Sequence, residues 1–361
     1  MKIDLIAGAR PNFMKIAPIL EAIKKAREQG GVISYRLVHT GQHYDKNMSG
    51  NFFVQLGIPA PDYNLEAGGG TQAEQTANIM LKYEKLLLNE PCDLTLVVGD
   101  VTSTMACSIV AKKLNIKVAH VEAGIRSGDY TMPEEINRMV TDSITDYFFT
   151  TSQKANMNLK KQGVEEERIF FVGNTMIDTL LKNEDRFIKP TIWDELNLSK
   201  QNYFVITLHR PANVDEADKL RLLIGEIVDN VNQLPVVFPV HPRTKKILDE
   251  LGINAPNLFM IPPQGYLEFN YLVKYSKGVI TDSGGITEET TVMGVPCITL
   301  RDNTERPETI TIGTNELIGT DPKAIKPALD KLFSGNWKKG AIPEKWDGKT
   351  AERIVEVLLS L

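Results

Sequence analysis

The sequence predicts an α/β protein built from two Rossmann-like, doubly wound domains that face a central cleft. Three observations support this prediction. Short apolar runs typical of parallel strands alternate with segments of helical periodicity. The alternation starts afresh after a charged helical stretch at 178–189. The chain of 361 residues is also long enough for two domains that each bury a core.

In the first half, the apolar runs predict strands at 3–7, 35–40, 94–98, 118–121, 147–150 and 169–172. A helix follows the first strand, because apolar residues recur at i, i+3, i+4 and i+7 from Ile16. We expect Pro18 in the first turns of this helix, where a proline is tolerated. A second helix is expected over 104–114.

In the second half, the same pattern predicts a helix over 215–232 and strands at 203–207, 236–240, 258–261, 278–281 and 297–300. We place the first domain at 1–175 and the second at 176–345. The remaining segment, 346–361, is expected to form a helix that could cross back to the first domain.

Composition argues against several classes of protein. No apolar run reaches the roughly 18 residues of a membrane-spanning helix, and the N-terminal residues enter a strand at once, so we expect no signal peptide. The net charge of −5 without a long basic run disfavours binding to nucleic acid. Cys92, Cys107 and Cys297 are widely spaced and indicate reduced thiols of a cytoplasmic protein, not a disulfide frame or a zinc site.

The first predicted strand ends in a turn that carries two cations, Arg10 and Lys15. The turn has neither the GxGxxG pattern of a dinucleotide fingerprint nor a P-loop. Backbone N–H groups and the dipole of the following helix nevertheless favour an anion there. The two cations therefore either bind an anion or are ordinary surface charges, and their spacing does not decide between these readings.

Three acidic residues stand at strand ends or at a helix start: Asp100, Glu122 and Glu134. A charge that directly follows an apolar strand is costly unless it is paired or used. Each acid also has an ordinary reading, since Asp100 could cap the next helix and Glu134 could open one. Arg126 could be a plain ion-pair partner. If the three acids converge, they could share acid–base work.

Two histidines of the second half, His209 and His241, also follow predicted strands. His209 could stabilise a phosphate or move a proton, although for either histidine alone a structural hydrogen bond is the commoner role. The polar segment 301–308 follows a strand as well, and its composition alone predicts a solvated loop.

The sharpest local signal is a strand that runs into Ser283, Gly284 and Gly285 and then into a helix. The glycines allow a close approach of the backbone, and the helix N-terminus offers N–H donors for a diphosphate. Glu288 and Glu289 lie about one turn into this helix, where a carboxylate can accept hydrogen bonds from ribose hydroxyls. A purely structural tight turn is the alternative, and the acids favour a nucleotide.

Taken together, nine segments resemble the non-hydrolysing UDP-N-acetylglucosamine 2-epimerases. They follow the order of that family and span nearly the whole chain: GARPNFMKIAP (8–18), TGQHYDKNM (40–48), VVGDVTST (97–104), HVEAGIRSGD (120–129), MPEEINR (132–138), GNTMIDTL (173–180), TLHRPANVD (207–215), DSGGITEE (282–289) and RDNTERPE (301–308). Each segment is weak alone, but the ordered set is specific. Two departures stand out: Asn12 replaces a glutamate of many members, and 68–71 lacks an arginine that some members carry nearby.

The resemblance implies a GT-B fold, a homodimer, and an enzyme that needs neither a metal nor a redox cofactor. It implies UDP-N-acetylglucosamine and UDP as the small-molecule ligands. By resemblance, four residues fall on catalytic positions: Asp100, Glu122, Glu134 and His209. A further set falls on substrate-binding positions: Arg10, Lys15, Arg138, His241, Ser283, Gly284, Gly285 and Glu289. Gln42 and His43, with His241, match motifs linked in bacterial members to a second, activating UDP-N-acetylglucosamine.

The implied reaction is inversion at C2 of the sugar through elimination of UDP and its return. Three other readings stay open at this stage. A hydrolysing 2-epimerase would release UDP and N-acetylmannosamine. A related enzyme would epimerise a UDP-diacetamido uronate. A glycosyltransferase or a silent nucleotide-sugar binder would use the same fold for another purpose, because fold does not fix function.

Overall fold

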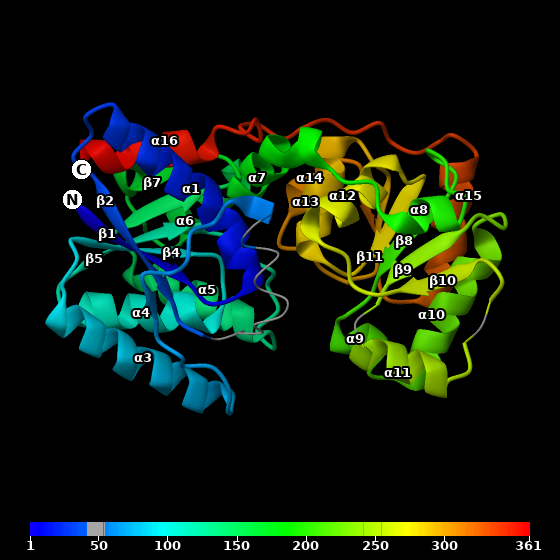
Figure 1. The fold of residues 1–361 in the computed structure, drawn as a ribbon, viewed down its shortest axis with the longest axis horizontal. Coiled ribbons are helices and arrows are strands. Elements are labelled where there is room, and N and C mark those ends of the chain that lie inside the picture. The colour runs from blue at the N-terminus through cyan, green and yellow to red at the C-terminus, as the bar shows by residue number, and fades with distance from the viewer. Residues whose placement is uncertain (42–52, 54, 241, 254) are drawn as a thin grey trace. The chain divides into compact units, whose positions relative to one another are not determined.

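The computed structural model describes residues 1–41, 53, 55–240, 242–253 and 255–361. The chain divides into two compact units (Figure 1). Unit 1 comprises Met1–Lys182 together with Glu344–Leu361, and unit 2 comprises Asn183–Pro343. Each unit contains one parallel sheet with helices, so the predicted fold class of two Rossmann-like domains is confirmed.

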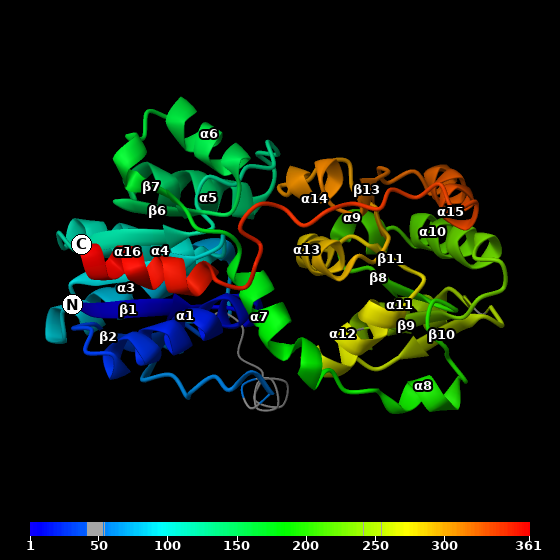
Figure 2. The ribbon, with the colours of Figure 1, turned by 90° about the horizontal axis from the view of Figure 1, so that it is seen from above.

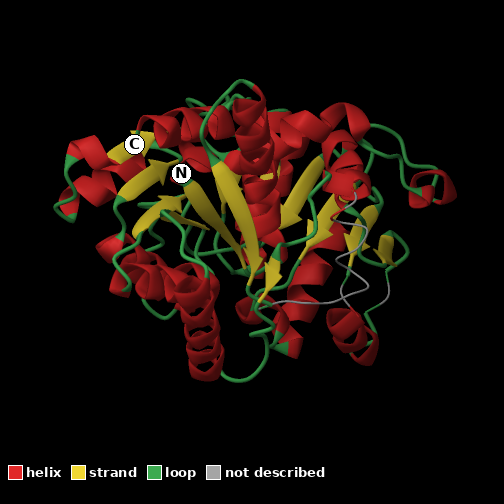
Figure 3. Ribbon diagram, turned by 60° about the vertical axis from the view of Figure 1, so that its left-hand side comes forward, coloured by secondary structure: helices red, strands yellow, loops and turns green. Residues whose placement is uncertain are grey.

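Unit 1 has a seven-stranded sheet in the order β3-β2-β1-β4-β5-β6-β7. All neighbouring strands are parallel and can be followed in yellow in Figure 3. The strands are β1 (Lys2–Ala7), β2 (Ser34–His39), β3 (Tyr63–Asn64), β4 (Leu94–Val98), β5 (Lys117–Val121), β6 (Tyr147–Thr150) and β7 (Ile169–Phe171). Strand β3 is not among the predicted strands, because two residues at a sheet edge leave no periodic pattern.

Helices cover both faces of this sheet. Figure 1 shows α1 and α16 over one face and α3 and α4 over the other. The helices are α1 (Arg10–Glu28), α3 (Gln72–Asn89), α4 (Thr102–Lys113), α5 (Pro133–Ile144), α6 (Gln153–Lys161), α7 (Thr175–Asn183) and α16 (Thr350–Ser360), with the short 3₁₀ turn η1 (Glu166–Arg168). A second 3₁₀ turn, η2 (Glu184–Arg186), follows α7 and belongs to unit 2. Helix α3, which was not expected, begins with a capping box between Thr71 and Glu74.

Pro18 lies inside α1 and not in its first turns, so that prediction is wrong. The helix already begins at Arg10, about two turns earlier. Pro18 has no N–H to donate to the carbonyl of Met14, four residues before it. The Thr179 hydroxyl of α7 donates to that carbonyl instead, with Oγ1 and O 2.6 Å apart. A side chain from another helix thus replaces the backbone bond that proline removes.

The C-terminal helix α16 belongs to unit 1 and lies beside α1 (Figure 2). Its N-terminus is held by Asp178, whose two carboxylate oxygens accept from the backbone N–H groups of Thr350 (3.1 Å) and Ala351 (2.7 Å). Burial raises the pKa of Asp178 above its ordinary value, although these bonds oppose the shift. An exposed ion pair between Lys25 and Glu352 joins the two helices.

Unit 2 has a six-stranded parallel sheet in the order β10-β9-β8-β11-β12-β13. Its strands are β8 (Phe204–Thr207), β9 (Val236–Pro239), β10 (Leu258–Ile261), β11 (Gly278–Thr281), β12 (Cys297–Thr299) and β13 (Asn315–Leu317). Its helices are α8 (Thr191–Glu195), α9 (Pro211–Val214), α10 (Ala217–Asn230), α11 (Pro242–Glu250), α12 (Tyr266–Tyr275), α13 (Gly284–Met293), α14 (Pro307–Thr311) and α15 (Ile325–Phe333), with the 3₁₀ turn η3 (Pro322–Ala324).

The unit 2 core lies on both faces of this sheet. Phe204 and Phe238 of the strands pack with Leu223 and Ile227 of α10 on one face. The other face packs under α12 and α13. Fully buried β-branched and aromatic strand residues explain why these runs were readable as parallel strands. None of the described helices combines the length and the apolar character needed to cross a membrane.

The order of strands reverses once in each sheet. In unit 1 the chain lays β2 and β3 on one side of β1 and then returns to place β4 on the other side. In unit 2 it does the same with β9 and β10 on one side of β8 and β11 on the other. Open α/β sheets bind ligands beyond the carboxyl ends of the strands at such a reversal. The loops after β1, β4, β8 and β11 are therefore the places to look for a site.

Candidate active site

Lys15 and Glu122 form a buried ion pair at the reversal point of unit 1. Lys15 Nζ lies 2.7 Å from Glu122 Oε2, and the two side chains are 12% and 3% exposed. Glu122 directly follows β5 with φ of +70°, a left-handed conformation that is uncommon for a residue with a side chain. Such strain is kept where the surrounding structure needs the side chain in that place. The predicted cation and the predicted acid therefore meet.

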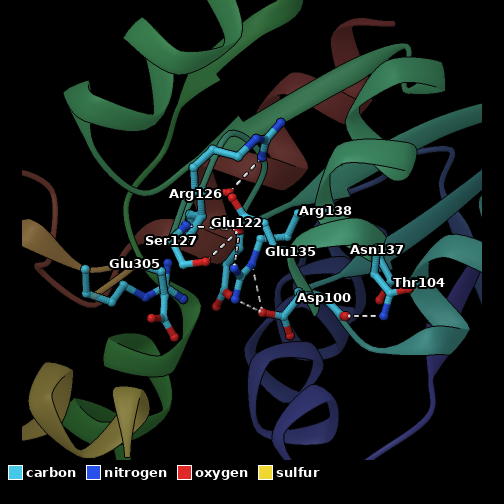
Figure 4. Close-up of polar contacts among 12 residues, drawn as sticks. Asp100, Thr104, Glu122, Arg126, Ser127, Glu135, Asn137, Arg138 and Glu305 are labelled. Carbon is cyan, nitrogen blue, oxygen red and sulfur yellow. Dashed lines mark hydrogen bonds and ion pairs between the residues drawn. The ribbon is translucent and has the colours of Figure 1, made fainter. Parts of the chain in front are cut away.

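Asp100 is held by a second cation, Arg138 of α5. The Arg138 Nε and Nη2 groups donate to Asp100 Oδ2 at 3.0 and 2.6 Å, as Figure 4 shows. The amide of Asn137 donates to the backbone carbonyl of Asp100 at 2.9 Å. Asp100 thus has a fixed orientation without capping α4, whose N-cap residue is Val101. Arg138, predicted to bind substrate, is 3% exposed and turned toward acidic side chains.

Glu134 and Glu135 have different environments, although both open α5. Glu135 is buried and accepts from Arg138 Nη1 (2.7 Å), the backbone N–H groups of Ser127 and Gly128 (3.0 Å each) and the Ser127 hydroxyl (Figure 4). Burial opposes its charge, but these donors outweigh it and lower the pKa of Glu135. Glu134 is half-buried and has no hydrogen bond or ion pair with the described residues. Glu135 is therefore structural, and Glu134 keeps a carboxylate for other work.

The turn after β1 carries Arg10 at the N-terminus of α1, whose first turn has no acidic residue. A cation at that end of a helix is unfavourable by itself and suits a bound anion. Asn12 holds the turn, because its Oδ1 accepts from the N–H groups of Gly8 and Ala9 while its Nδ2 donates to the carbonyl of Val98 at 3.0 Å. A glutamate at this position could not make the last bond, since a carboxylate has no hydrogen to donate.

In unit 2, His209 is oriented by the carboxylate of Asp282, a residue without a predicted role. His209 Nδ1 lies 2.8 Å from Asp282 Oδ1, and the histidine is 61% exposed while the aspartate is fully buried. Asp282 also accepts from Arg210 N–H and from Asn213 Nδ2. Burial raises its pKa, but His209 and the other donors outweigh burial and lower it. Asp282 fixes the ring by its Nδ1 side and leaves Nε2 for a ligand.

The N-terminus of α13 follows β11, next to His209. Ser283 is the N-cap residue, and its side chain does not cap the helix. Gly284 and Gly285 open the first turn, which has no acidic side chain. The backbone N–H groups of this turn are donors for an anion. Neither glycine has a side chain that would cover these N–H groups.

The two acids further along α13 divide their roles. Glu288 pairs with Arg306 Nε at 2.5 Å. Glu289 is buried and accepts from the Tyr266 hydroxyl at 2.9 Å. Burial raises the pKa of Glu289 to about 7, and the bonds from Tyr266 and Asn270 oppose that shift. Because Glu288 is paired with Arg306, Glu289 is the acid of α13 that suits a neutral ligand with hydrogen-bonding groups.

The segment 301–308 is not a solvated loop, so the prediction from its composition is wrong. Arg301, Arg306 and Glu308 are 4%, 6% and 7% exposed. The two arginines are paired with carboxylates: Arg301 Nη2 lies 2.6 Å from Glu305 Oε2, and Arg306 pairs with Glu288. Composition cannot distinguish charges that face water from charges that face each other across a turn.

Three predicted residues, Gln42, His43 and His241, lie outside the described residues. Among the residues that the structure does describe, no three His, Cys, Asp or Glu side chains are grouped so that they could hold a metal ion. The three cysteines are free and buried.

Comparison with known proteins identifies the family. The family described as UDP-N-acetylglucosamine 2-epimerase matches residues 25–359. The UDP-N-acetylglucosamine 2-epimerase of Methanocaldococcus jannaschii is 41% identical over 376 residues, which cover 99% of each chain. Its crystal structure in complex with UDP-GlcNAc and UDP matches with a TM-score of 0.89 over 100% of both chains.

Two further relatives show the breadth of the similarity. A UDP-2,3-diacetamido-2,3-dideoxy-D-glucuronate 2-epimerase of Pseudomonas aeruginosa is 41% identical over 369 residues, the full length of both chains. The crystal structure of the UDP-GlcNAc 2-epimerase of Neisseria meningitidis bound to UDP-GlcNAc is 30% identical, covers 100% of both chains and has a TM-score of 0.89. Two GT-B-type domains, the strand-end acids and these matches agree, and the chain belongs to the UDP-N-acetylglucosamine 2-epimerase family.

Proposed function

We propose that this protein is a non-hydrolysing epimerase that interconverts UDP-N-acetylglucosamine and UDP-N-acetylmannosamine. One observation carries the proposal: two carboxylates, Asp100 and Glu122, follow adjacent strands β4 and β5, and each is held by its own cation. An epimerase must remove a proton from one face of a carbon and return it to the other. Two separately held acid–base groups fit that need.

The chemistry begins with the bond between C1 and the diphosphate. The hydrogen at C2 is not next to a carbonyl, so a carboxylate with a pKa of about 4 cannot remove it directly. When the C1–O bond breaks and its electron pair leaves with UDP, positive charge at C1 acidifies the C2 hydrogen. A carboxylate then takes that proton, and 2-acetamidoglucal remains. Protonation of C2 on the opposite face and return of UDP to C1 give the epimer.

Each group has a part in this route. Arg10, His209 and the N-terminus of α13 stabilise the negative charge that builds up on the leaving diphosphate. Asp100, Glu122 and Glu134 carry the protons collectively. Glu289, with its raised pKa, accepts hydrogen bonds from the ribose hydroxyls. Lys15 holds Glu122 in place, and Arg138 holds Asp100.

The test follows the C2 hydrogen and the phosphorus atoms in one sample. We incubate the protein with UDP-N-acetylglucosamine in D₂O and record proton and phosphorus NMR spectra. Deuterium at C2, with the diphosphate still attached to the sugar, is the expected result. Free UDP that accumulates with N-acetylmannosamine would instead show a hydrolysing enzyme. Unchanged protium at C2 would overturn the proposal and would leave a glycosyltransferase, a silent binder or an epimerase of another nucleotide sugar.

A second candidate substrate is a UDP-2,3-diacetamido uronate. It is favoured by the Pseudomonas aeruginosa relative, which is as similar in identity as the Methanocaldococcus jannaschii one. Turnover of the two nucleotide sugars, measured side by side at equal concentration, separates the candidates. The faster substrate identifies the activity, because both reactions invert the same carbon.

The quaternary structure and the location are part of the same proposal. We expect a homodimer, which sedimentation velocity measures directly. A cytoplasmic location is expected from the three free cysteines, because such thiols persist where the environment is reducing.

A further inference from the structure

His120 is a buried titratable residue to which the proposed mechanism gives no role. It lies on β5, two residues before Glu122, and is 0% exposed. Its ring contacts two oxygen atoms. Nε2 lies 2.8 Å from the carbonyl oxygen of Gly99, and Nδ1 lies 2.7 Å from Asp142 Oδ1.

The two contacts fix the orientation of the ring. A carbonyl oxygen only accepts, so Nε2 must donate to Gly99. Nδ1 faces a carboxylate that also receives a bond from Arg126 Nη2 at 2.7 Å and from the N–H of Gly124 at 3.1 Å. Asp142 is thus held by its neighbours, and its contact with Nδ1 keeps the ring turned so that Nε2 meets the Gly99 carbonyl.

The hydrogen bond from His120 to the Gly99 carbonyl lies next to Asp100, the acid that follows β4. Gly99 has φ of +70°, and its N–H donates to the carbonyl of Val121 at 3.0 Å. A Cβ atom at residue 99 would lie 3.2 Å from Lys15 Nζ, so the turn passes directly beside the Lys15–Glu122 pair. The carbonyl that His120 holds belongs to the peptide bond that leads into Asp100. Rotation of this peptide would move Asp100 relative to Glu122.

We propose that His120 is a positioning residue, which holds the Gly99 carbonyl and thereby fixes the distance and orientation between Asp100 and Glu122. The inference rests on the proposed epimerase function. The groups that face His120 are Asp142 and, behind it, Arg126 from the loop before α5, together with the Gly99 carbonyl. Arg126, Asp142 and His120 thus form one chain of contacts that supports the turn.

Two substitutions separate positioning from a general loss of packing. His120→Gln places an amide nitrogen near Nε2 and keeps the bond to Gly99, whereas His120→Asn places it near Nδ1 and keeps only the bond to Asp142. If His120 acts through Gly99, kcat of His120→Asn falls about 100-fold with little change in KM, the scale expected for a misplaced catalytic group. His120→Gln should retain at least about ten times more activity than His120→Asn.

A matched control removes another buried hydrogen bond from the same sheet. The Tyr83 hydroxyl bonds Thr95 at 2.8 Å and Asp4 at 3.1 Å, at the amino end of β4 and away from its catalytic end. Tyr83→Phe should lower Tm without lowering kcat. Equal kcat values in both His120 variants, with Tm values lowered as in Tyr83→Phe, would show a purely structural histidine and overturn the inference.

The bond from Nε2 to Gly99 is tested without reference to activity. The chain has five histidines, so protein labelled with ¹⁵N-histidine gives few signals, and His120 is assigned as the signal missing from either variant. Nε2 of His120 should carry a hydrogen, because the Gly99 carbonyl can only accept. An Nε2 without a hydrogen in the wild type would contradict the inference, whereas absence of C2 exchange in the wild type would contradict the proposed function alone.

Discussion

Lys15 Nζ and Glu122 Oε2 lie 2.7 Å apart in the interior of unit 1, although the two residues are 107 positions apart in the chain. Two buried charges neutralise one another only while both are present. The pair therefore couples the turn after β1 to the end of β5, and it makes the proposed catalytic carboxylate of Glu122 dependent on a cation from another element.

Replacing Lys15 should unfold the protein more easily as well as inactivate it. Lys15→Met leaves Glu122 as a buried, uncompensated charge, so the free energy of unfolding should fall by about 3–5 kcal/mol. The double variant Lys15→Met/Glu122→Gln should recover much of that loss but no turnover. Urea denaturation measures the first quantity, and C2 deuterium exchange measures the second. Equal stability of the single and double variants would contradict the coupling.

The proposed catalytic groups should each matter to turnover. Asp100→Asn, Glu122→Gln and His209→Asn should each lower kcat at least about 100-fold, the size expected for acid–base and charge-stabilising groups. Circular dichroism confirms that each variant is folded before kcat is compared. Near-normal turnover in all three would refute the site.

The neighbouring glutamates of α5 should behave in opposite ways. Glu135→Gln weakens four hydrogen bonds to a buried carboxylate and should lower Tm. Glu134→Gln removes no bond among the described residues and should leave Tm unchanged while lowering kcat. Thermal unfolding and steady-state kinetics on the same preparations decide the matter. The reverse pattern would exchange the roles given to the two acids.

Glu289 should make unit 2 less stable as the pH rises. Its pKa of about 7 in the folded protein lies above the ordinary 4.5, so the folded state binds more protons than the unfolded state between those values. Stability should fall from pH 4.5 to 7 by up to roughly 3 kcal/mol and stay constant above. Glu289→Gln should remove this component, which urea denaturation at pH 5 and pH 8 measures. If the unfolding free energy had the same pH dependence in the wild type and in Glu289→Gln, the raised pKa of the buried Glu289 carboxyl would be contradicted.

Thr179 should stabilise α1 only because Pro18 is there. Thr179→Val leaves the carbonyl of Met14 without its donor and should cost about 1 kcal/mol. Pro18→Ala restores a backbone N–H, so the same threonine substitution should cost less in that background. A double-mutant cycle of unfolding free energies measures the difference. An equal cost in both backgrounds would show that the two residues are independent.

Much of the fold was readable because the parallel strands are buried on both faces and therefore appear as apolar runs. The two-residue strand β3 and helix α3 escaped notice for different reasons. β3 is too short to have a period, whereas α3 follows a capping box at Thr71 and Glu74 that the sequence does display. Pro18 is tolerated inside α1 because Thr179 supplies the hydrogen-bond donor that proline lacks. No local sequence pattern connects these two residues.

The candidate site was readable only in part. Strand ends pointed to Asp100, Glu122 and His209, because a parallel sheet brings the carboxyl ends of its strands to one edge. The choice between Glu134 and Glu135 needed three-dimensional neighbours, and so did the roles of Asp282 and His120. The burial of Arg301 and Arg306 was invisible for the same reason, since their counter-charges come from residues whose proximity only the fold creates.

The return of α16 to unit 1 has a consequence for biosynthesis. The ribosome makes residues 1–182, then all of unit 2, and only then the helix whose N-terminus Asp178 holds. During that interval α1 lacks the helix beside it, and the Asp178 carboxylate has no backbone N–H groups to receive. Unit 2 is one uninterrupted segment, so it can complete its fold while unit 1 still lacks α16. The first domain to be translated is therefore the last to be finished.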